Sequence, residues 1–458
     1  MKFNRIYILL LAFAGFACEP DLIDERVKPS SGDADFSNYV AVGNSLTAGY
    51  ADGGLYLEAQ QQSYPSILAS KFSLAGGGEF KQPLTTENGI EGYLSIASFS
   101  STGTPNITRI TPGAFDPATG GPFNNIGVPG IRVLDIDIAG YGNPAANPYF
   151  ARILLGTGQA LTTTYLDVVT ASNPTFFTNW MGNNDVLGYA TSGGIEEGTG
   201  SPAGSYIGAI TPVAAFEFKY KALITALTAN GAKGAVATIP NVTDIPYFTT
   251  AANLLRGNGV PLDSFPLSPQ LAGGLNAIYA ANGYTWDGEP FVAGMNTFAV
   301  VTQGKVVKKL DPENDLILLP ITAIAGQFAT GLGTGVAATF SAKPIPDQFV
   351  LDAEEVARAK KAVSAYNNII KAEARNKGLA LWDANAFFAD FVKNGFVTSN
   401  VTLSASFISG GAFSLDGVHA TPRGYALVAQ KFLDAIEAKY STVLPEVRIQ
   451  EYRTVNLP

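Results

Sequence analysis

Residues 38–50 read NYVAVGNSLTAGY, and this stretch decides which kind of fold the chain adopts. Its first part, residues 39–42, is a short apolar run in which no polar residue alternates. Such a run is typical of a parallel strand that is covered on both faces. Gly43 and Asn44 interrupt the run, and Ser45 begins a segment that can continue as a helix. The stretch therefore predicts a buried strand that turns directly into a helix, with a serine at the turn.

Four further apolar runs of this kind predict the remaining strands of a parallel sheet. They are short, are bounded by turn residues, and cover residues 124–128, 175–182, 234–240 and 379–383. Apolar residues also recur at helical spacing from Glu354 to Arg375 and from Pro422 to Tyr440. Thr421 can cap the second helix, whose first position suits proline. Strands that alternate with helices predict an α/β fold, a three-layer α/β/α sandwich whose ligands bind at the carboxyl ends of the strands.

Composition excludes several classes of function. Hydrophobic residues make up 47% of the 458-residue chain and the formal net charge is −9, with no cluster of Lys and Arg after the N-terminus. Nucleic acid is therefore not an expected partner, because phosphate binding needs clustered cations. One Cys and one His exclude an internal disulfide and a zinc site built from several such ligands. The glycine-rich stretches 76–78 and 331–335 lack the spacing of nucleotide-binding loops, so no cofactor or metal is predicted.

The N-terminus has the pattern of an export signal. Lys2 and Arg5 precede an apolar run that is short for a membrane span, and residues 1–17 are predicted to be a signal peptide. Cys18 follows directly, where a bacterial lipoprotein signal has its lipidated residue, so the sequence resembles a lipobox with Gly15 in place of the usual Leu. Cleavage at the same bond by an ordinary signal peptidase is the alternative, and it would give a secreted protein without an anchor.

Residues 18–37 are polar and contain Pro, Ser and Gly, which is typical of a flexible tether. We expect an exported protein that is lipid-anchored through Cys18 in the cell envelope, at the outer membrane of a Gram-negative bacterium. The membrane is then its partner through this anchor.

The rest of the chain is expected to form one domain over residues 38–445, followed by a tail at 446–458. Two stretches, 55–123 and 248–343, are rich in Gly, Thr, Ser and Asn and do not follow the alternation of strands and helices. We interpret them as insertions on the active-site side. Within the second insertion, residues 316–342 are rich in apolar side chains and carry no charge. This run predicts either a wall for an acyl chain or a segment that packs on the enlarged core.

The only histidine, His419, lies in the sequence SLDGVHATP immediately before the last predicted helix. A serine nucleophile needs an imidazole base, and the base needs a group that orients its ring. Asp416 lies three residues earlier and can curl back to hold that ring. The alternative is a surface histidine beside a helix cap, without a catalytic role.

Four blocks of sequence together resemble the SGNH (GDSL-type) hydrolase family. They are VGNSLTAGY at 42–50, NNIGVPG at 124–130, GNND at 182–185 and DGVH at 416–419. The resemblance implies a flavodoxin-like hydrolase fold that works without a cofactor. It also implies a catalytic triad of Ser45, Asp416 and His419, with an oxyanion hole made by Ser45, Gly130 and Asn184.

Two positions of these blocks carry alternatives. Gly127 competes with Gly130 for the oxyanion role, and we prefer Gly130 because it lies in a Pro-Gly turn. The sequence departs from the family pattern at Asn44, where Asp is usual, and this change concerns local hydrogen bonding more than catalysis.

Three functions follow from these residues. The first is an esterase or lipase that hydrolyses carboxylic esters of small molecules or lipids through an acyl-enzyme intermediate. The second is a glycan O-deacetylase with the same chemistry, for which Tyr279, Tyr284 and Trp286 could provide a sugar platform. The third is a non-catalytic surface lipoprotein that only binds a glycan or lipid. A complete triad with oxyanion donors disfavours the third, because binding alone does not need it.

Overall fold

The computed structural model describes residues 28–101, 105–155, 160–196, 208–257, 259–323, 343–398 and 400–456. The predicted signal peptide, Cys18 and the first half of the tether lie outside these residues, as does the apolar run from residue 324 onward. Among the described residues, none of the helices has both the length and the apolar character needed to cross a membrane.

A five-stranded parallel sheet forms the centre of the fold. Its strands are β1 (Tyr39–Gly43), β4 (Asn125–Gly127), β5 (Phe176–Trp180), β6 (Lys233–Ala237) and β14 (Ala380–Trp382). The order across the sheet is β14-β6-β5-β1-β4, so β1 lies between β5 and β4. All five strands overlap the runs that the sequence predicts, and β6 begins one residue before its run, at Lys233. Gly43 at the end of β1 pairs with Gly127 and Trp180, which brings the carboxyl ends of three strands to one edge.

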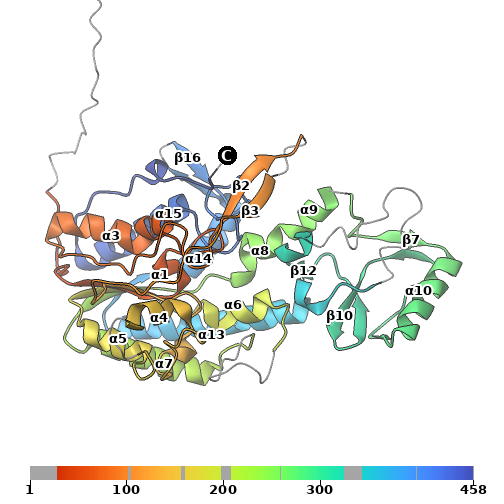
Figure 1. Cartoon of the computed structure of the whole chain (residues 1–458), viewed down its shortest axis with the longest axis horizontal. Helices are drawn as coiled ribbons and strands as arrows, with labels where there is room; N and C mark the ends of the chain where they lie inside the picture. Colours follow the sequence, from red (N-terminus) through yellow and green to blue (C-terminus); the bar gives the residue numbers. More distant parts are fainter. Residues whose placement is uncertain are drawn as a thin grey trace, which may run out of the picture.

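Helices cover both faces of this sheet, as predicted for a three-layer sandwich (Figure 1). On one face, Val40 and Val42 of β1 pack in a core with α5 (Tyr165–Ser172), α7 (Val213–Thr228) and α13 (Ala353–Asn376). On the other face, Tyr39 and Ala41 pack with α3 (Tyr64–Phe72) and α15 (Pro422–Tyr440). Successive side chains of a strand point to opposite faces, and here both faces are buried. This explains why the strand sequence is continuously apolar.

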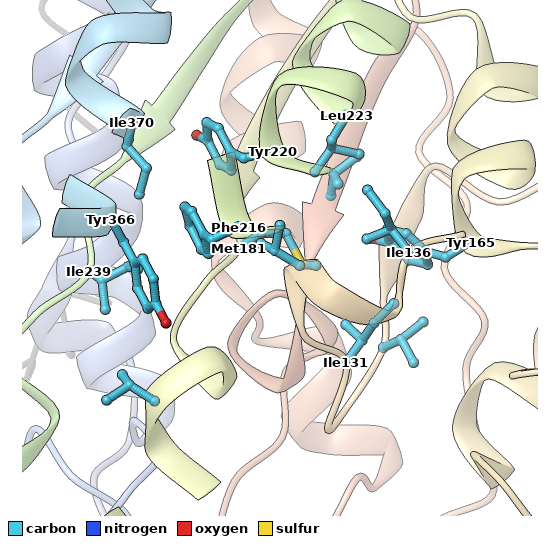
Figure 2. Packing of buried hydrophobic residues seen from close by; sticks show 14 of the residues in the cluster. Ile131, Ile136, Tyr165, Met181, Phe216, Tyr220, Leu223, Ile239, Tyr366 and Ile370 are labelled. Atoms are coloured by element: carbon cyan, nitrogen blue, oxygen red, sulfur yellow. The ribbon is translucent and has the colours of Figure 1, made fainter. Parts of the chain in front are cut away.

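Aromatic rings fill much of the first core (Figure 2). Phe216 of α7 stacks on Tyr366 of α13 with 4.1 Å between ring centroids, which joins the two longest helices of that layer. Two shorter helices, α4 (Pro148–Leu154) and α6 (Asn184–Thr191), complete it.

Both predicted long helices are present, and each begins at a capping residue. Asp352 and Glu355 form a reciprocal capping box at the start of α13. Thr421 accepts the N–H of Gly424 at the start of α15, and Pro422 occupies the first helical position. The cap fixes where α15 starts and thereby also fixes the loop that contains His419.

The first predicted insertion needs a correction. Its early part forms α2 (Leu57–Gln61) and α3, and α3 belongs to the core layer because Tyr64 stacks on Phe432 of α15 at 5.1 Å. The signal of α3 is obscured because the residues after 73 make the composition of the whole stretch 55–123 polar. Only the later part decorates the fold, as a hairpin of β2 (Leu94–Phe99) and β3 (Pro105–Arg109).

The second insertion folds as a lobe that extends away from the sheet (Figure 1). It has a hydrophobic core of its own, which includes Leu275, Tyr279 and Val307. Its elements are α8 (Pro246–Thr249), α9 (Ala251–Gly257), β7 (Phe265–Leu267), α10 (Pro269–Ala281), β8 (Thr285–Trp286), β9 (Gly294–Asn296), β10 (Ala299–Gln303), β11 (Val306–Lys309) and β12 (Leu316–Ile317), which pairs with β13 (Val350–Leu351). In the described part of the apolar run, Ile317 and Ile321 pack into this core.

The segment expected to be a C-terminal tail packs back onto the domain. The residues just before this segment lie beside the first described residues, because Ser30 and Val443 form an antiparallel bridge. Arg453 then donates two hydrogen bonds to Glu58, and its backbone carbonyl accepts the N–H of Arg423 in α15. The remaining elements before this segment are α14 (Ala384–Asn394), β15 (Phe396–Thr398) and β16 (Val401–Leu403).

Candidate active site

Ser45 stands at the first position of α1 (Ser45–Ala48), directly after β1. The Asn44 side chain caps this helix by accepting the N–H of Leu46 at 3.1 Å. Gly43 makes the sharp turn possible, because a Cβ atom at this position would lie 1.9 Å from the Thr47 hydroxyl oxygen. The turn aims the serine hydroxyl out of the carboxyl edge of the sheet.

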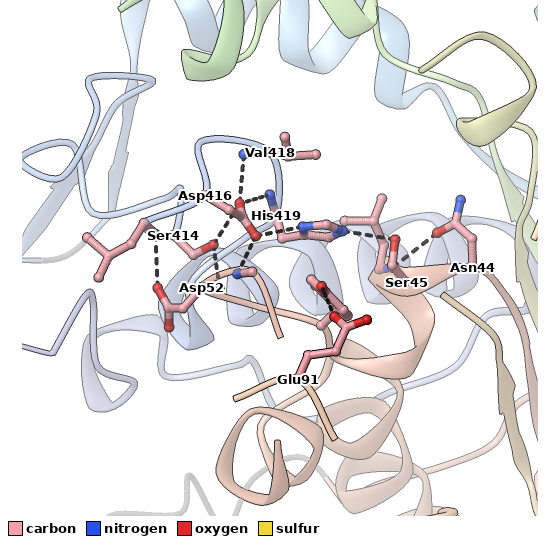
Figure 3. A network of polar contacts seen from close by, with 12 residues as sticks. Asn44, Ser45, Asp52, Glu91, Ser414, Asp416, Val418 and His419 are labelled. Carbon is pink, nitrogen blue, oxygen red and sulfur yellow. Dashed lines mark hydrogen bonds and ion pairs between the residues drawn. The ribbon is translucent and has the colours of Figure 1, made fainter. Parts of the chain in front are cut away.

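His419 and Asp416 lie in the loop before α15, and the structure brings them to Ser45 (Figure 3). The imidazole Nε2 lies 2.9 Å from Ser45 Oγ. Its Nδ1 lies 2.8 Å from Asp416 Oδ2. The three side chains therefore form one continuous chain of hydrogen bonds, although 374 positions separate the serine from the histidine.

The Asp416 carboxylate is held by several donors besides the imidazole. Its Oδ1 accepts the backbone N–H groups of Val418 and His419, both at 2.8 Å, and its Oδ2 accepts that of Gly53 at 2.8 Å. Burial by itself raises the pKa of Asp416, but His419 and these N–H groups outweigh it and hold the pKa well below its ordinary value. The group is therefore an anion at neutral pH, suited to stabilise an imidazolium.

A second buried carboxylate joins the segment after Ser45 to the histidine loop. Asp52 is 2% exposed and its Oδ1 accepts the N–H of Leu415 at 2.9 Å. Its own N–H donates to the Ser414 hydroxyl, which in turn donates to Asp416. Tyr56 donates to Asp52 at 2.8 Å and accepts from Arg453 at 2.9 Å. These contacts could not be predicted from the sequence, because no local motif marks Asp52 or Arg453.

An aromatic ring packs against the His419 imidazole. The centroid of Tyr50 lies 4.6 Å from that of His419. The Tyr50 hydroxyl donates to Glu91 at 2.9 Å. Burial, together with the charge of Glu91, raises the pKa of Tyr50 well above its ordinary value, so the hydroxyl remains protonated. Tyr50 lies inside the quoted serine block, five residues after Ser45, which is the one signal that could have identified it.

Asn184 begins α6 and lines the same pocket as Ser45 and His419. Its amide nitrogen donates one hydrogen to the Ile131 carbonyl at 2.9 Å. An amide carries two such hydrogens, so the second remains available to a ligand. The backbone carbonyl that orients Asn184 follows Gly130 directly, which brings the second and third sequence blocks together.

The structure distinguishes the two candidate glycines. The N–H of Gly127 donates to the Asn125 side chain at 2.9 Å, so it is already used. The N–H of Gly130 donates to none of the described residues, and Gly130 is exposed with a φ of 82°. Gly130 does not line the pocket beside Ser45. Of the two, it is the one with a donor available to an oxyanion.

Asp185, the last residue of the GNND block, has a structural role. It is fully buried and accepts the N–H groups of Val133 at 2.8 Å and Leu134 at 3.3 Å. Burial raises its pKa to about 7. These bonds fix the segment that follows Gly130 and Ile131.

A pocket of about 70 Å³ opens beside Ser45. Its lining is mainly apolar and comes from both helical layers and from the segment after β6: Asn44, Ser45, Leu46, Trp180, Asn183, Asn184, Leu187, Pro240, Val242, Ile245, Phe388, Phe413, Val418, His419, Ala420 and Val428. No residue of the described part of the apolar run, 316–323, is among them. The described part of the run is therefore not a wall of this pocket; Leu319, Pro320 and Thr322 line a separate cleft that also includes Asp416.

Within the described ranges, no group of three or more His, Cys, Asp and Glu side chains is arranged to hold a metal ion.

A family model described as GDSL-like Lipase/Acylhydrolase matches residues 39–432, a span that contains all four sequence blocks. No curated protein sequence matches the chain. Among solved structures, an extracellular lipase from Streptomyces rimosus is similar, with 13% sequence identity and a TM-score of 0.32. That alignment covers 88% of this chain and 99% of the lipase chain.

Proposed function

Because the chain belongs to the GDSL-like lipase/acylhydrolase family of ester hydrolases, we propose that Ser45, His419 and Asp416 are its catalytic triad and act on carboxylic esters. The observation that carries this proposal is the unbroken chain of contacts from Asp416 through His419 to Ser45, at 2.8 and 2.9 Å. A nucleophilic serine needs a base within hydrogen-bond distance, and the base needs a group that orients it. His419 contacts both Ser45 and Asp416 and so meets both requirements.

The first half of the reaction forms an acyl-enzyme. His419 Nε2 takes the Ser45 proton as Oγ attacks the ester carbonyl carbon. The carbonyl oxygen becomes an oxyanion, which accepts hydrogen bonds from Asn184 and from the backbone N–H groups of Ser45 and Gly130. When the carbonyl reforms, the bond to the alcohol oxygen breaks, and the imidazolium gives its proton to that oxygen. Asp416 stabilises the imidazolium throughout.

Water completes the second half. His419 takes a proton from a water molecule as the water attacks the acyl carbon, and a second oxyanion forms in the same place. Collapse breaks the bond to Ser45 Oγ, which receives the proton from the imidazolium. The products are a carboxylic acid and the original enzyme.

The pocket beside Ser45 supports a short hydrocarbon acyl group as the preferred one. Its volume of about 70 Å³ and its mainly apolar lining suit an acyl chain of a few carbons. Each methylene that enters contributes up to about 0.8 kcal/mol to transition-state binding, a several-fold gain in kcat/KM until the pocket is full. Acetyl would leave most of this space unused.

The glycan alternative has less support at the residues that suggested it. Tyr279 is buried, and the partly buried Trp286 stacks on it with centroids 5.4 Å apart at the edge of the lobe core. Tyr284 is also partly buried, and the Lys305 ammonium lies 4.5 Å from the centroid of its ring. A sugar platform needs exposed ring faces, and this packing covers at least one face of each ring.

Kinetics of the purified full-length protein on p-nitrophenyl acetate, butyrate, hexanoate and octanoate test both parts of the proposal. We expect kcat/KM to rise to about the hexanoate ester and then fall. Ser45→Ala should abolish turnover, whereas Ser70→Ala, at an exposed position of α3, should not change it. Full turnover by Ser45→Ala would refute the mechanism. A steady fall beyond acetate, with release of acetate from an acetylated polysaccharide, would favour the deacetylase.

We also propose that Cys18 carries a lipid that anchors the enzyme in the cell envelope. The supporting observation is the signal-like N-terminus, which ends directly before the only cysteine. Wild-type protein should partition into the detergent phase and incorporate labelled fatty acid, and Cys18→Ser should do neither. An unmodified Cys18 in a wholly soluble protein would overturn this proposal.

A further inference from the structure

Two asparagines beside the proposed catalytic residues carry buried amide nitrogens without partners. Asn44 is 1% exposed and Asn183 is 7% exposed. The Nδ2 atom of each has no hydrogen-bond partner among the described residues. The orientation of Asn44 is fixed, because its Oδ1 accepts the Leu46 N–H. Figure 3 shows its nitrogen pointing away from Ser45.

Both residues line the pocket beside Ser45, whose other walls are mainly apolar. A buried donor without an acceptor costs free energy, and native proteins leave few of them. Two such donors in one pocket indicate that an acceptor arrives with the ligand. In the free enzyme, water can take that place and be displaced on binding.

The positions of these donors indicate where the acceptor lies. Asn44 directly precedes Ser45, and Asn183 directly precedes Asn184. Ser45 and Asn184 flank the carbonyl group in the proposed reaction. Both asparagines also line the small pocket that receives the acyl chain in the proposed reaction, so the acceptor is expected within the first few carbons of that chain.

We propose that the pocket selects acyl groups that carry a hydroxyl or keto oxygen near the ester carbonyl, and that Asn44 and Asn183 donate to this oxygen. The inference rests on the proposed ester hydrolysis and narrows its substrate class. It also gives a role to Asn44, which stands where the sequence pattern of the family usually has Asp. An Asp carboxylate at position 44 has only acceptor atoms and would repel the oxygen of such an acyl group, whereas the Asn44 amide can donate a hydrogen bond to it.

Paired substrates test the inference. We would measure kcat/KM for p-nitrophenyl butyrate and for the (R)- and (S)-3-hydroxybutyrate esters. One hydroxy enantiomer should be preferred over butyrate by about 3- to 10-fold, the range of one net hydrogen bond. Asn44→Asp keeps an acceptor for the Leu46 N–H but removes the donor, so the preference should fall to about one or below. Asn183→Asp should reduce it independently.

The matched control is Asn296→Asp, a buried asparagine in the lobe, which should keep the wild-type preference. Equal kcat/KM for the three esters in the wild type, unchanged by Asn44→Asp and Asn183→Asp, would overturn the inference and leave ester hydrolysis intact.

Calorimetric binding of the same esters to Ser45→Ala separates the two proposals. If the wild type hydrolysed none of the esters, the proposed function would fail, and tighter binding of a hydroxy ester would still support the inference. Equal binding of all three would overturn it. Melting temperatures of each variant identify any that fails to fold, and the two asparagine positions then test the inference separately.

Discussion

Asp416→Asn should place the proton of the only imidazole on the wrong nitrogen. An asparagine side chain has one acceptor oxygen where the carboxylate has two. If its nitrogen took the place of Oδ1, it would face the N–H groups of Val418 and His419 and the Ser414 hydroxyl. If it took the place of Oδ2, it would face only the Gly53 N–H and the imidazole. The second arrangement loses fewer hydrogen bonds, so we expect the amide to donate to His419 Nδ1.

The imidazole must then accept at Nδ1 and carry its proton on Nε2, which points at Ser45. In this tautomer it cannot take the serine proton. We expect kcat to fall by about 10⁴-fold, or about 5 kcal/mol in activation free energy, with KM within a few-fold of wild type. The free energy of unfolding should fall by only about 1.5–3 kcal/mol, because the charge-assisted bond to Gly53 is lost.

Two measurements check this prediction. Steady-state kinetics on p-nitrophenyl butyrate give kcat, and ¹⁵N NMR reports the tautomer without overlap because the chain contains one histidine. Asp352→Asn, an isosteric change at the cap of α13, should leave both unchanged. A kcat within tenfold of wild type, or a slow variant whose proton remains on Nδ1, would refute the reasoning.

Three further changes test other parts of the site. Asn184→Ala should lower kcat by about 10²–10³-fold in steady-state kinetics, because an oxyanion donor is lost; an unchanged kcat would mean that its amide serves only Ile131. Asp185→Asn should flatten the pH dependence of stability in urea unfolding. Its carboxyl has a pKa of about 7 against an ordinary 3.8, so its contribution is full below about pH 4 and is lost, up to about 4 kcal/mol, as the pH rises through 7. Ile245→Trp should fill the pocket and lower the hexanoate-to-acetate ratio of kcat/KM at least tenfold, and an unchanged ratio would place the acyl chain elsewhere.

The sequence predicts the central sheet and the last helix because their signals are local. Continuous apolar runs mark strands buried on both faces, and the pairing of Thr421 with Pro422 marks the start of α15. The four sequence blocks follow the ends of such elements, so the fold brings them together. The distances among Ser45, His419 and Asp416 follow from this placement.

The support around these residues could not be predicted, because it depends on contacts between distant segments. Asp52 bonds to Leu415 across 363 positions, and Arg453 reaches Tyr56 across 397. Neither contact has a local pattern of residue types. The lobe could not be predicted for a similar reason. Its core combines short strands and helices, so its apolar residues do not recur at strand or helix spacing over a long stretch. Residues 57–72 precede a long polar stretch, whose composition obscures the signal of α3.

The distance along the chain between Ser45 and His419 also determines when hydrolytic activity appears. A polypeptide that emerges from a ribosome, or passes through a translocation channel from its N-terminus, exposes β1 and Ser45 early. The neighbours of β1 in the sheet, β4 and β5, follow much later, so its pairing must wait for distant residues and folding is expected to be slow. His419 emerges only after all five strands. Until then the serine hydroxyl has no base and is a weak nucleophile. If the proposed triad is correct, a nascent chain should therefore not cleave esters before its C-terminal part has been made.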